Sequence, residues 1–135
     1  MRVLVDTSAL LPLLSRNDVD HTAASRIWAW LKEERSLLFS TNYVLLESLA
    51  LIQNRLGMAA VRDFQEVVVP LLEIEWVDEN LHQASVAALL TADRRRLSLV
   101  DCTNFAAMRR LGLDMAFAFD HHFAEQGFTL AQVPP

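Results

Sequence analysis

Four acidic residues occupy positions where an acid on a solvated surface is not expected: Asp6, Glu47, Asp101 and Asp120. Clustered carboxylate oxygens are the ligands that hard divalent cations such as Mg²⁺ and Mn²⁺ prefer, usually alongside several water molecules. A cation held in this way can activate water and neutralise the charge of a reacting phosphodiester. If the fold brings the four side chains together, they indicate cation-assisted hydrolysis of a phosphate ester.

Two of these acids directly follow predicted strands. Asp6 comes after the apolar run Arg2–Val5, and Asp120 comes after Met115–Phe119. Short apolar runs that end in polar residues are typical of strands buried in a sheet. We therefore expect both acids at the carboxyl ends of central strands, where parallel sheets place their ligand sites.

The other two acids lie in predicted helices. Glu47 falls within Tyr43–Ile52, which is so apolar that we expect the helix to be buried, and an ionised Glu there is costly unless it is paired or binds a cation. Asp101 follows Ser98 at the start of an apolar helix, so its carboxylate should point outward near the helix N-terminus.

The predicted elements alternate along the chain. Strands are expected at Arg2–Val5, Leu37–Ser40, Ile74–Val77, Met115–Phe119 and, at one edge, Phe128–Val133. Helices are expected at Val19–Glu34, Thr41–Leu56, Met58–Leu72, Asp78–Ala92 and Ser98–Leu111. This alternation predicts a single α/β/α domain over residues 1–135, with a mostly parallel central sheet covered by helices on both faces.

Each acid also has a purely structural explanation. Asp6 can cap the next helix, and Ser98–Asp101 is the pattern of a capping box. Glu47 can pair with an arginine such as Arg62 or Arg109. Asp120 can belong to a turn before the two histidines that follow it. Since the structural explanation must hold for all four acids at once, we favour a shared site.

Composition excludes several classes of protein. The chain has 53% hydrophobic and 21% charged residues, which is typical of a folded globular protein. Its single cysteine, Cys102, excludes an internal disulfide framework and a multi-cysteine zinc site. Its three glycines are too far apart for a phosphate-binding loop. The net charge of −5 argues against binding nucleic acid by bulk attraction, but not against binding phosphates through cations.

Hydropathy indicates neither a membrane protein nor a secreted one. The longest run without a charged residue, Asn80–Ala92, is well short of the ~20 residues that a spanning helix needs. No apolar signal segment precedes the first predicted strand. We therefore expect a cytoplasmic protein with no membrane contact.

Other candidate residues give weaker signals. Arg94, Arg95 and Arg96 form the only basic run, and they are either a solvated loop or a guide for substrate phosphates close to Asp101. For the adjacent histidines His121–His122 we favour a structural or surface role over metal ligation, because neighbouring side chains rarely face one ion.

The sequence resembles the PIN domain family, and within it the VapC-like toxin ribonucleases of VapBC-type toxin–antitoxin systems. Four blocks carry the resemblance, in the family's order and across essentially the whole chain. They are Val3–Leu10, Thr41–Ser48, Ser98–Met108 and Ala118–Phe123. The first and third blocks are the most specific.

The resemblance implies a function and a site. PIN domains use such acids to bind Mg²⁺ or Mn²⁺ and hydrolyse RNA, which implies a metal-dependent endoribonuclease. By resemblance the catalytic metal ligands are Asp6, Glu47, Asp101 and Asp120. Thr7 or Ser8 would then place a hydroxyl near the metal or the substrate phosphate, and Asn104 stands where the family often has serine.

The resemblance also implies partners. An antitoxin would hold the toxin inactive by covering the acidic pocket, and we expect a groove formed partly by Trp28, Trp30 and Leu31 to bind it. A homodimer and an RNA substrate are likewise expected, whereas the identity of the RNA is not encoded in any recognisable pattern.

Two competing functions remain at this point. A catalytically silent PIN-like scaffold or RNA-binding module would be favoured by loss of one or two acids, but all four are present. A phosphoryl-transfer enzyme acting through Asp6 usually has a second aspartate two residues later, where this chain has Ser8. It also needs a lysine in its site, and Lys32, the only lysine, lies in an amphipathic helix.

Overall fold

The computed structural model describes residues 1–135 and contains a five-stranded sheet in the order β3-β2-β1-β4-β5. All four strand pairings are parallel, so the predicted α/β architecture is confirmed. The strands are β1 (Arg2–Val5), β2 (Leu37–Thr41), β3 (Leu72–Glu75), β4 (Met115–Phe117) and β5 (Thr129–Leu130).

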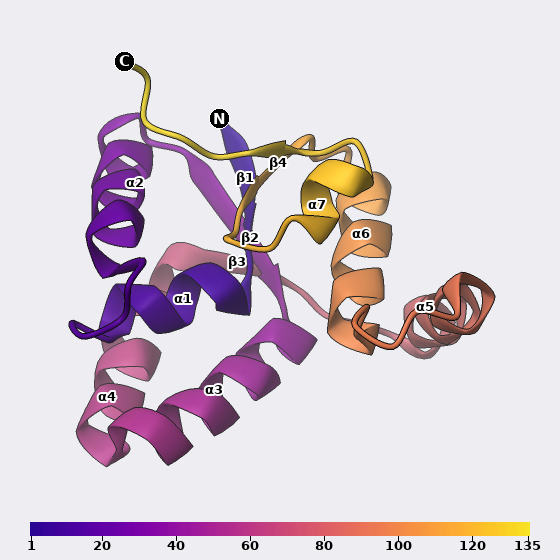
Figure 1. Ribbon diagram of the computed structural model, residues 1–135, viewed down its shortest axis with the longest axis horizontal. Coiled ribbons are helices and arrows are strands. Elements are labelled where there is room, and N and C mark those ends of the chain that lie inside the picture. The colour runs from indigo at the N-terminus through magenta and orange to yellow at the C-terminus, as the bar shows by residue number, and fades with distance from the viewer.

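Helices cover both faces of the sheet (Figure 1). One side holds α1 (Thr7–Leu14), α2 (His21–Glu33), α3 (Asn42–Leu56) and α4 (Met58–Asp63). The other side holds α6 (Leu99–Leu111) and α7 (His122–Glu125). The remaining helix, α5 (Glu79–Ala92), packs against α6 and projects away from the sheet. None of the helices combines the length and the apolar composition that a membrane-spanning segment needs.

The central strand β1 shows why the sheet needs both layers. Successive side chains of a strand point to opposite faces. Val3 and Val5 accordingly enter the core beneath α1 and α2, while Leu4 enters a second core beneath α6. All three side chains are fully buried, which fixes the register of β1 and the position of the residue that follows it.

Three strands differ from the predicted boundaries by two residues or more, and β2 extends one residue further than predicted. The helical segment after α4 continues as a π-helical turn, Phe64–Val68, and a 3-10 turn, Val69–Leu71. Because the helical path ends there, β3 begins at Leu72, two residues before the predicted strand. The strands β4 and β5 are shorter than predicted, since the chain turns away from the sheet after Phe117 and after Leu130.

Two expectations about burial are wrong. Only Val44, Ser48 and Ile52 are buried in α3, and Leu46 is 70% exposed, so the helix is not buried all round. Trp28 and Leu31 were expected to form part of a partner groove but belong to the core. The ring of Trp28 packs 6.4 Å from that of Phe117 and the residue is only 8% exposed, whereas Trp30 is half-buried.

Candidate metal centre

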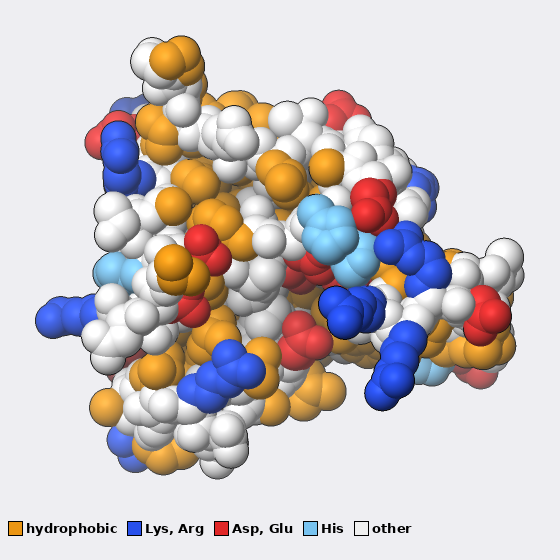
Figure 2. Space-filling model, viewed as in Figure 1, with side chains coloured by type: hydrophobic (Ala, Val, Ile, Leu, Met, Phe, Trp, Pro, Cys, Tyr) orange, Lys and Arg blue, Asp and Glu red, His pale blue; other side chains and the backbone are white.

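A cavity of about 390 Å³ opens at the carboxyl ends of the central strands and contains all four predicted acids. Its acidic lining residues are Asp6, Asp18, Asp20, Glu47, Asp101 and Asp120, and no basic side chain lines it. Figure 2 shows acidic side chains in a hollow near the middle of this face, with arginines and histidines gathered on one side. The fold therefore joins segments from most of the chain in one strongly acidic site.

Asp6 is the most buried of these acids and is held at both oxygens. Its Oδ2 accepts hydrogen bonds from the Ser8 amide at 3.1 Å and the Ser8 hydroxyl at 2.7 Å. Its Oδ1 accepts one from Asn104 Nδ2 at 2.8 Å. Asp6 is also the N-cap of α1. It therefore both caps the helix, as its structural explanation requires, and lines the acidic cavity. Ser8 further accepts a bond from the Phe119 amide at 3.0 Å, which ties α1 to the end of β4.

Asp101 also serves two purposes. Its Oδ2 accepts a hydrogen bond from the Ser98 amide at 3.0 Å, and the Asp101 amide donates to the Ser98 hydroxyl at 3.0 Å, which completes the expected capping box. The same carboxylate lines the acidic cavity. The cap fixes the start of α6 and thereby the orientation of the acid.

Glu47 reaches the cavity from the half-exposed side of α3 and forms no ion pair. The explanation that it pairs with Arg62 or Arg109 is therefore wrong; Arg109 instead donates to Gln126 at 2.8 Å. The Thr7 hydroxyl lies 3.0 Å from that of Ser48, so it holds α1 against the helix that carries Glu47.

Asp120 lies beside a buried histidine that the sequence analysis did not assign to the site. Its Oδ1 accepts a hydrogen bond from the His122 amide at 2.9 Å and lies 2.8 Å from His122 Nδ1. The same nitrogen is 3.8 Å from Asp101 Oδ2. The only signal in the sequence is that His122 stands two residues after an acid at a strand end. At this spacing the carboxylate can accept a hydrogen bond from the amide.

Burial and mutual repulsion raise the pKa of two acids in the site, because no basic side chain lines the cavity to offset their charges. Burial raises the pKa of Asp6, and the charges of Glu47 and Asp120 raise it further. Burial likewise raises the pKa of Asp101, with added repulsion from Asp120 and Asp6. A bound cation would reverse both effects because it favours the ionised carboxylates.

The unpaired polar atoms of the site also fit a cation. The Asn104 side chain is fully buried, yet its Oδ1 has no hydrogen-bond partner. Buried polar atoms are almost always satisfied, so this acceptor fits a site that holds water or a hydrated ion. A cavity whose charged side chains are all carboxylates matches the ligand preference of Mg²⁺ and Mn²⁺.

Two further acids in the cavity, Asp18 and Asp20, were missed. They lie in the connection between α1 and α2, where Asp18 accepts a hydrogen bond from the Asp20 amide at 2.9 Å. A pair of acids in a polar loop carries no sequence signal that separates it from an ordinary turn. Only the packing of α1 against α2 brings them to the cavity.

The basic run lies next to the cavity and not inside it. Arg94 and Arg95 line a neighbouring pocket that shares Ser98 with the acidic cavity. Arg94 pairs with Glu125 of α7 at 3.0 Å, whereas Arg95 and Arg96 are exposed and form no ion pair.

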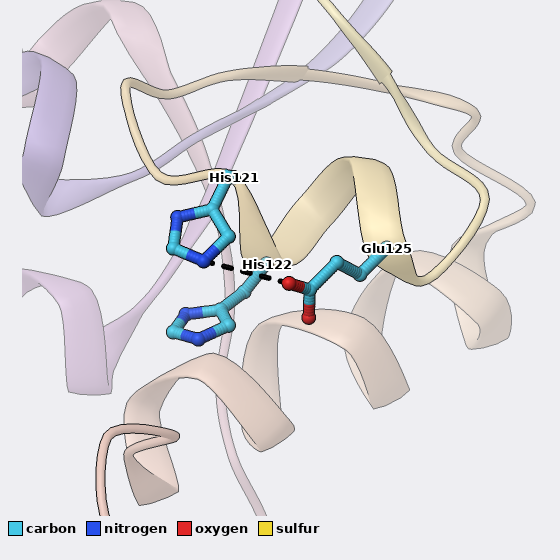
Figure 3. A group of neighbouring side chains, drawn as sticks. All are labelled: His121, His122 and Glu125. Carbon is cyan, nitrogen blue, oxygen red and sulfur yellow. Dashed lines mark ion pairs between the residues drawn. The ribbon is translucent and has the colours of Figure 1, made fainter.

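The two histidines of α7 face different surroundings. Figure 3 shows His121 joined to Glu125, and the ion pair measures 3.4 Å. The His121 side chain is 76% exposed, whereas that of His122 is 8% exposed. The expected structural or surface role therefore describes His121, while His122 contacts the acids.

The fold and site define an α/β/α protein with an acidic cavity at the carboxyl edge of a parallel sheet. Comparison with known proteins agrees. The chain matches the PIN domain model over residues 3–128 and belongs to the PIN domain family.

Similar proteins cover nearly the full chain. A Mycobacterium tuberculosis protein named 23S rRNA-specific endonuclease VapC20 is 34% identical over 128 residues, which is 94% of this chain and 95% of that protein. The crystal structure of M. tuberculosis VapC20, described as a sarcin-ricin loop cleaving toxin, has a TM-score of 0.87 at 30% identity and covers 97% of this chain and 99% of that chain. DNA-bound VapBC2 from Rickettsia felis shares the fold, with a TM-score of 0.70 at 10% identity over 96% of this chain and 97% of that chain.

Proposed function

We propose that this PIN domain, residues 1–135, is a divalent-cation-dependent endoribonuclease and the toxin of a toxin–antitoxin pair. The observation that carries the proposal is the convergence of Asp6, Glu47, Asp101 and Asp120 on one cavity without a basic side chain. The relative named 23S rRNA-specific endonuclease, similar along almost its whole length, supports cleavage of RNA.

Mg²⁺ or Mn²⁺ is the proposed cation, because every charged donor in the cavity is a carboxylate. The residues that would hold it are Asp6, Glu47, Asp101 and Asp120. Once bound, the cation would lower the pKa of water and offset the negative charge of the phosphodiester. Since the site supplies this chemistry without a side-chain nucleophile, no Ser–His or Cys–His pair is needed.

The chain's own contribution is to fix the carboxylates in advance. Ser8 and Asn104 bind opposite oxygens of Asp6, so that carboxylate is held in one orientation. The capping box does the same for Asp101. Ligands held in this way require little rearrangement when the cation and the substrate arrive.

RNA is the proposed substrate, with ribosomal RNA as the first candidate because of the relative's name. Arg95 and Arg96 are exposed and free of ion pairs, and we assign them to contacts with RNA phosphates. Arg94 would hold their loop against α7 through Glu125. An RNA substrate in ribosomes would place the protein in the cytoplasm.

A second copy of the chain is the proposed partner for an apolar surface beside the cavity. Tyr43, Leu46, Leu99 and Val100 line a pocket of about 400 Å³, which shares Glu47 with the acidic cavity. Exposed apolar patches of this kind commonly mark protein interfaces. A homodimer formed here would bury Leu46 and bring two acidic cavities close to one another.

A protein antitoxin is the proposed inhibitor. A cationic side chain from its tail would complement the six carboxylates and compete with both the cation and the RNA. VapC20 is described as a toxin, and it covers nearly all of this chain.

The proposal is tested by incubating the purified protein with ribosomes and mapping new RNA ends by primer extension, with Mg²⁺, with Mn²⁺ and with chelator. We expect cation-dependent cuts at a small number of positions. Binding of RNA without any cut, under conditions where the cation is bound, would favour the alternative of a catalytically silent scaffold or RNA-binding module.

A further inference from the structure

His122 is a buried titratable side chain beside the acidic cavity that the proposed mechanism does not use. It is 7% exposed and lies at the start of α7, two residues after Asp120. It is not among the residues that line the cavity. Its contacts are with the carboxylates and not with the space that a substrate would fill.

Two groups of His122 meet the same carboxylate oxygen. The backbone amide donates to Asp120 Oδ1 at 2.9 Å, and ring Nδ1 lies 2.8 Å from that oxygen. Ring Nδ1 is also 3.8 Å from Asp101 Oδ2. One residue therefore reaches two acids that come from different elements, the end of β4 and the first turn of α6.

The ring is held firmly in this place. The next residue, Phe123, is fully buried and meets Phe105 edge to face, with centroids 5.1 Å apart. The His121 ring covers the outer side of the His122 ring at a centroid distance of 4.5 Å (Figure 3). The His122 imidazole consequently has little freedom to turn away from the acids.

The ring nitrogen is nevertheless not fully satisfied. Nδ1 has no well-aligned hydrogen bond despite its short distance to Asp120. Buried nitrogens are rarely left in this state. A small rotation of the Asp120 carboxylate, whose Oδ1 lies 2.8 Å from Nδ1, would complete a bond.

We propose that His122 is a positioning residue, whose imidazole holds the carboxylates of Asp120 and Asp101 at the spacing that the divalent cation requires. The inference rests on the proposed function only in taking these two acids as cation ligands. It needs no assumption about RNA. Groups that orient metal ligands from behind typically change metal affinity by about 10–100-fold when removed.

Direct ligation by His122 is the competing explanation. Ligand atoms of Asp101, Asp120 and His122 all lie within 4.8 Å of one another, so the three could share one ion. Two observations favour positioning instead. Nδ1 already faces Asp120 at hydrogen-bonding distance, and His122 does not line the cavity.

The test is Mn²⁺ affinity, measured by electron paramagnetic resonance on the full chain without RNA. His122→Leu fills a similar volume but removes the nitrogen, and we expect it to weaken Mn²⁺ binding by roughly 10-fold. His122→Asn returns an N–H near the position of Nδ1 and should restore most of the affinity. His82→Leu is the matched control, and it should leave the affinity within about twofold, because His82 contacts Tyr43 and does not line the acidic cavity. Circular dichroism confirms that each variant is folded.

Three results would overturn the proposal. The first is unchanged Mn²⁺ affinity in folded His122→Leu, and the second is an equal loss in His122→Asn and His122→Leu. The third is strong ¹⁴N coupling from a directly bound imidazole in the pulsed spectrum of the wild-type Mn²⁺ complex. If the affinities follow the expected order but no RNA is cut, the endoribonuclease function fails while the positioning role stands.

Discussion

Asn104 donates a hydrogen bond to Asp6 across 98 residues of sequence, with 2.8 Å between Nδ2 and Oδ1. Asn104 is fully buried in α6, and Asp6 directly follows the central strand β1. The bond therefore joins two distant segments of the chain at the most buried carboxylate of the acidic cavity. It is also the only bond that the Asp6 carboxylate forms with a residue outside its own turn.

Replacing Asn104 with Asp should destabilise the cation-free protein. The change removes the donor and places a second carboxylate against Asp6, which is an unsatisfied and repelling group in a buried position. We expect a loss of about 1–3 kcal/mol in the free energy of unfolding, measured by urea denaturation at neutral pH. Wild-type stability in this variant would show that the bond does not position Asp6.

Asp120→Asn should make the cation-free protein more stable at neutral pH. After burial itself, the charge of Asp120 contributes to raising the pKa of Asp6 and of Asp101. A carboxyl with a raised pKa in the folded state stabilises the fold below its unfolded pKa, and this contribution disappears as pH rises through the folded pKa. Asn removes one repelling charge and keeps an acceptor for the His122 amide.

The measurement is the difference in melting temperature between Asp120→Asn and wild type, in chelator, across pH. The difference should grow as pH rises from about 4 to about 7 and reach about 2–5 °C. Saturating Mn²⁺ should reverse it, because only the wild type offers the full set of carboxylates. A difference that does not depend on pH would contradict the account.

Arg95→Ala and Arg96→Ala should each weaken RNA binding through the salt-dependent part of the affinity. Every lost phosphate contact should lower the slope of log K against log salt by about 0.7–0.9. The readout is RNA binding at several salt concentrations in chelator, so that cleavage does not intervene. Arg26→Ala, an exposed arginine on α2, serves as the control. Equal slopes in the wild type and the three variants would show that Arg95 and Arg96 do not contact RNA phosphates.

Leu46→Asp should abolish the proposed homodimer. The side chain is 70% exposed at the centre of the apolar surface beside Glu47, and a charge there could not be buried against a second copy. Sedimentation velocity should show monomers for this variant. Val67→Asp changes an equally apolar, 63% exposed residue at another place in the fold and should leave the dimer intact. A Leu46→Asp protein that still sediments as a dimer would place the interface elsewhere.

Local patterns were sufficient to find the acids that follow strands. Asp6 and Asp120 each follow an apolar run, and in a parallel sheet the carboxyl ends of the strands lie at the same edge. The capping box of Ser98 and Asp101 is likewise a local pattern, and it forms as predicted. These features depend on a few neighbouring residues, so they can be recognised without tertiary information.

Features that depend on packing were harder to predict. Glu47 lines the cavity as expected, but the inferred reason was wrong, because part of the apolar surface of α3 faces outward at Leu46 instead of facing the core. The surface role expected for Trp28 is wrong for the opposite reason, since an amphipathic helix buries its aromatic side against the sheet. Asp18 and His122 join the site only through the packing of a loop and of a short helix.

The central claim is that the converging carboxylates bind the divalent cation with which RNA is cut. Its most direct test is cleavage of ribosomal RNA over a Mn²⁺ titration, run beside Mn²⁺ binding to the same samples of wild type, Asp6→Asn and Asp101→Asn, each checked for folding. We predict that cleavage and binding saturate together in the wild type and that both folded variants lose both. Cleavage that persists in chelator, or in a folded variant that no longer binds Mn²⁺, would contradict the account.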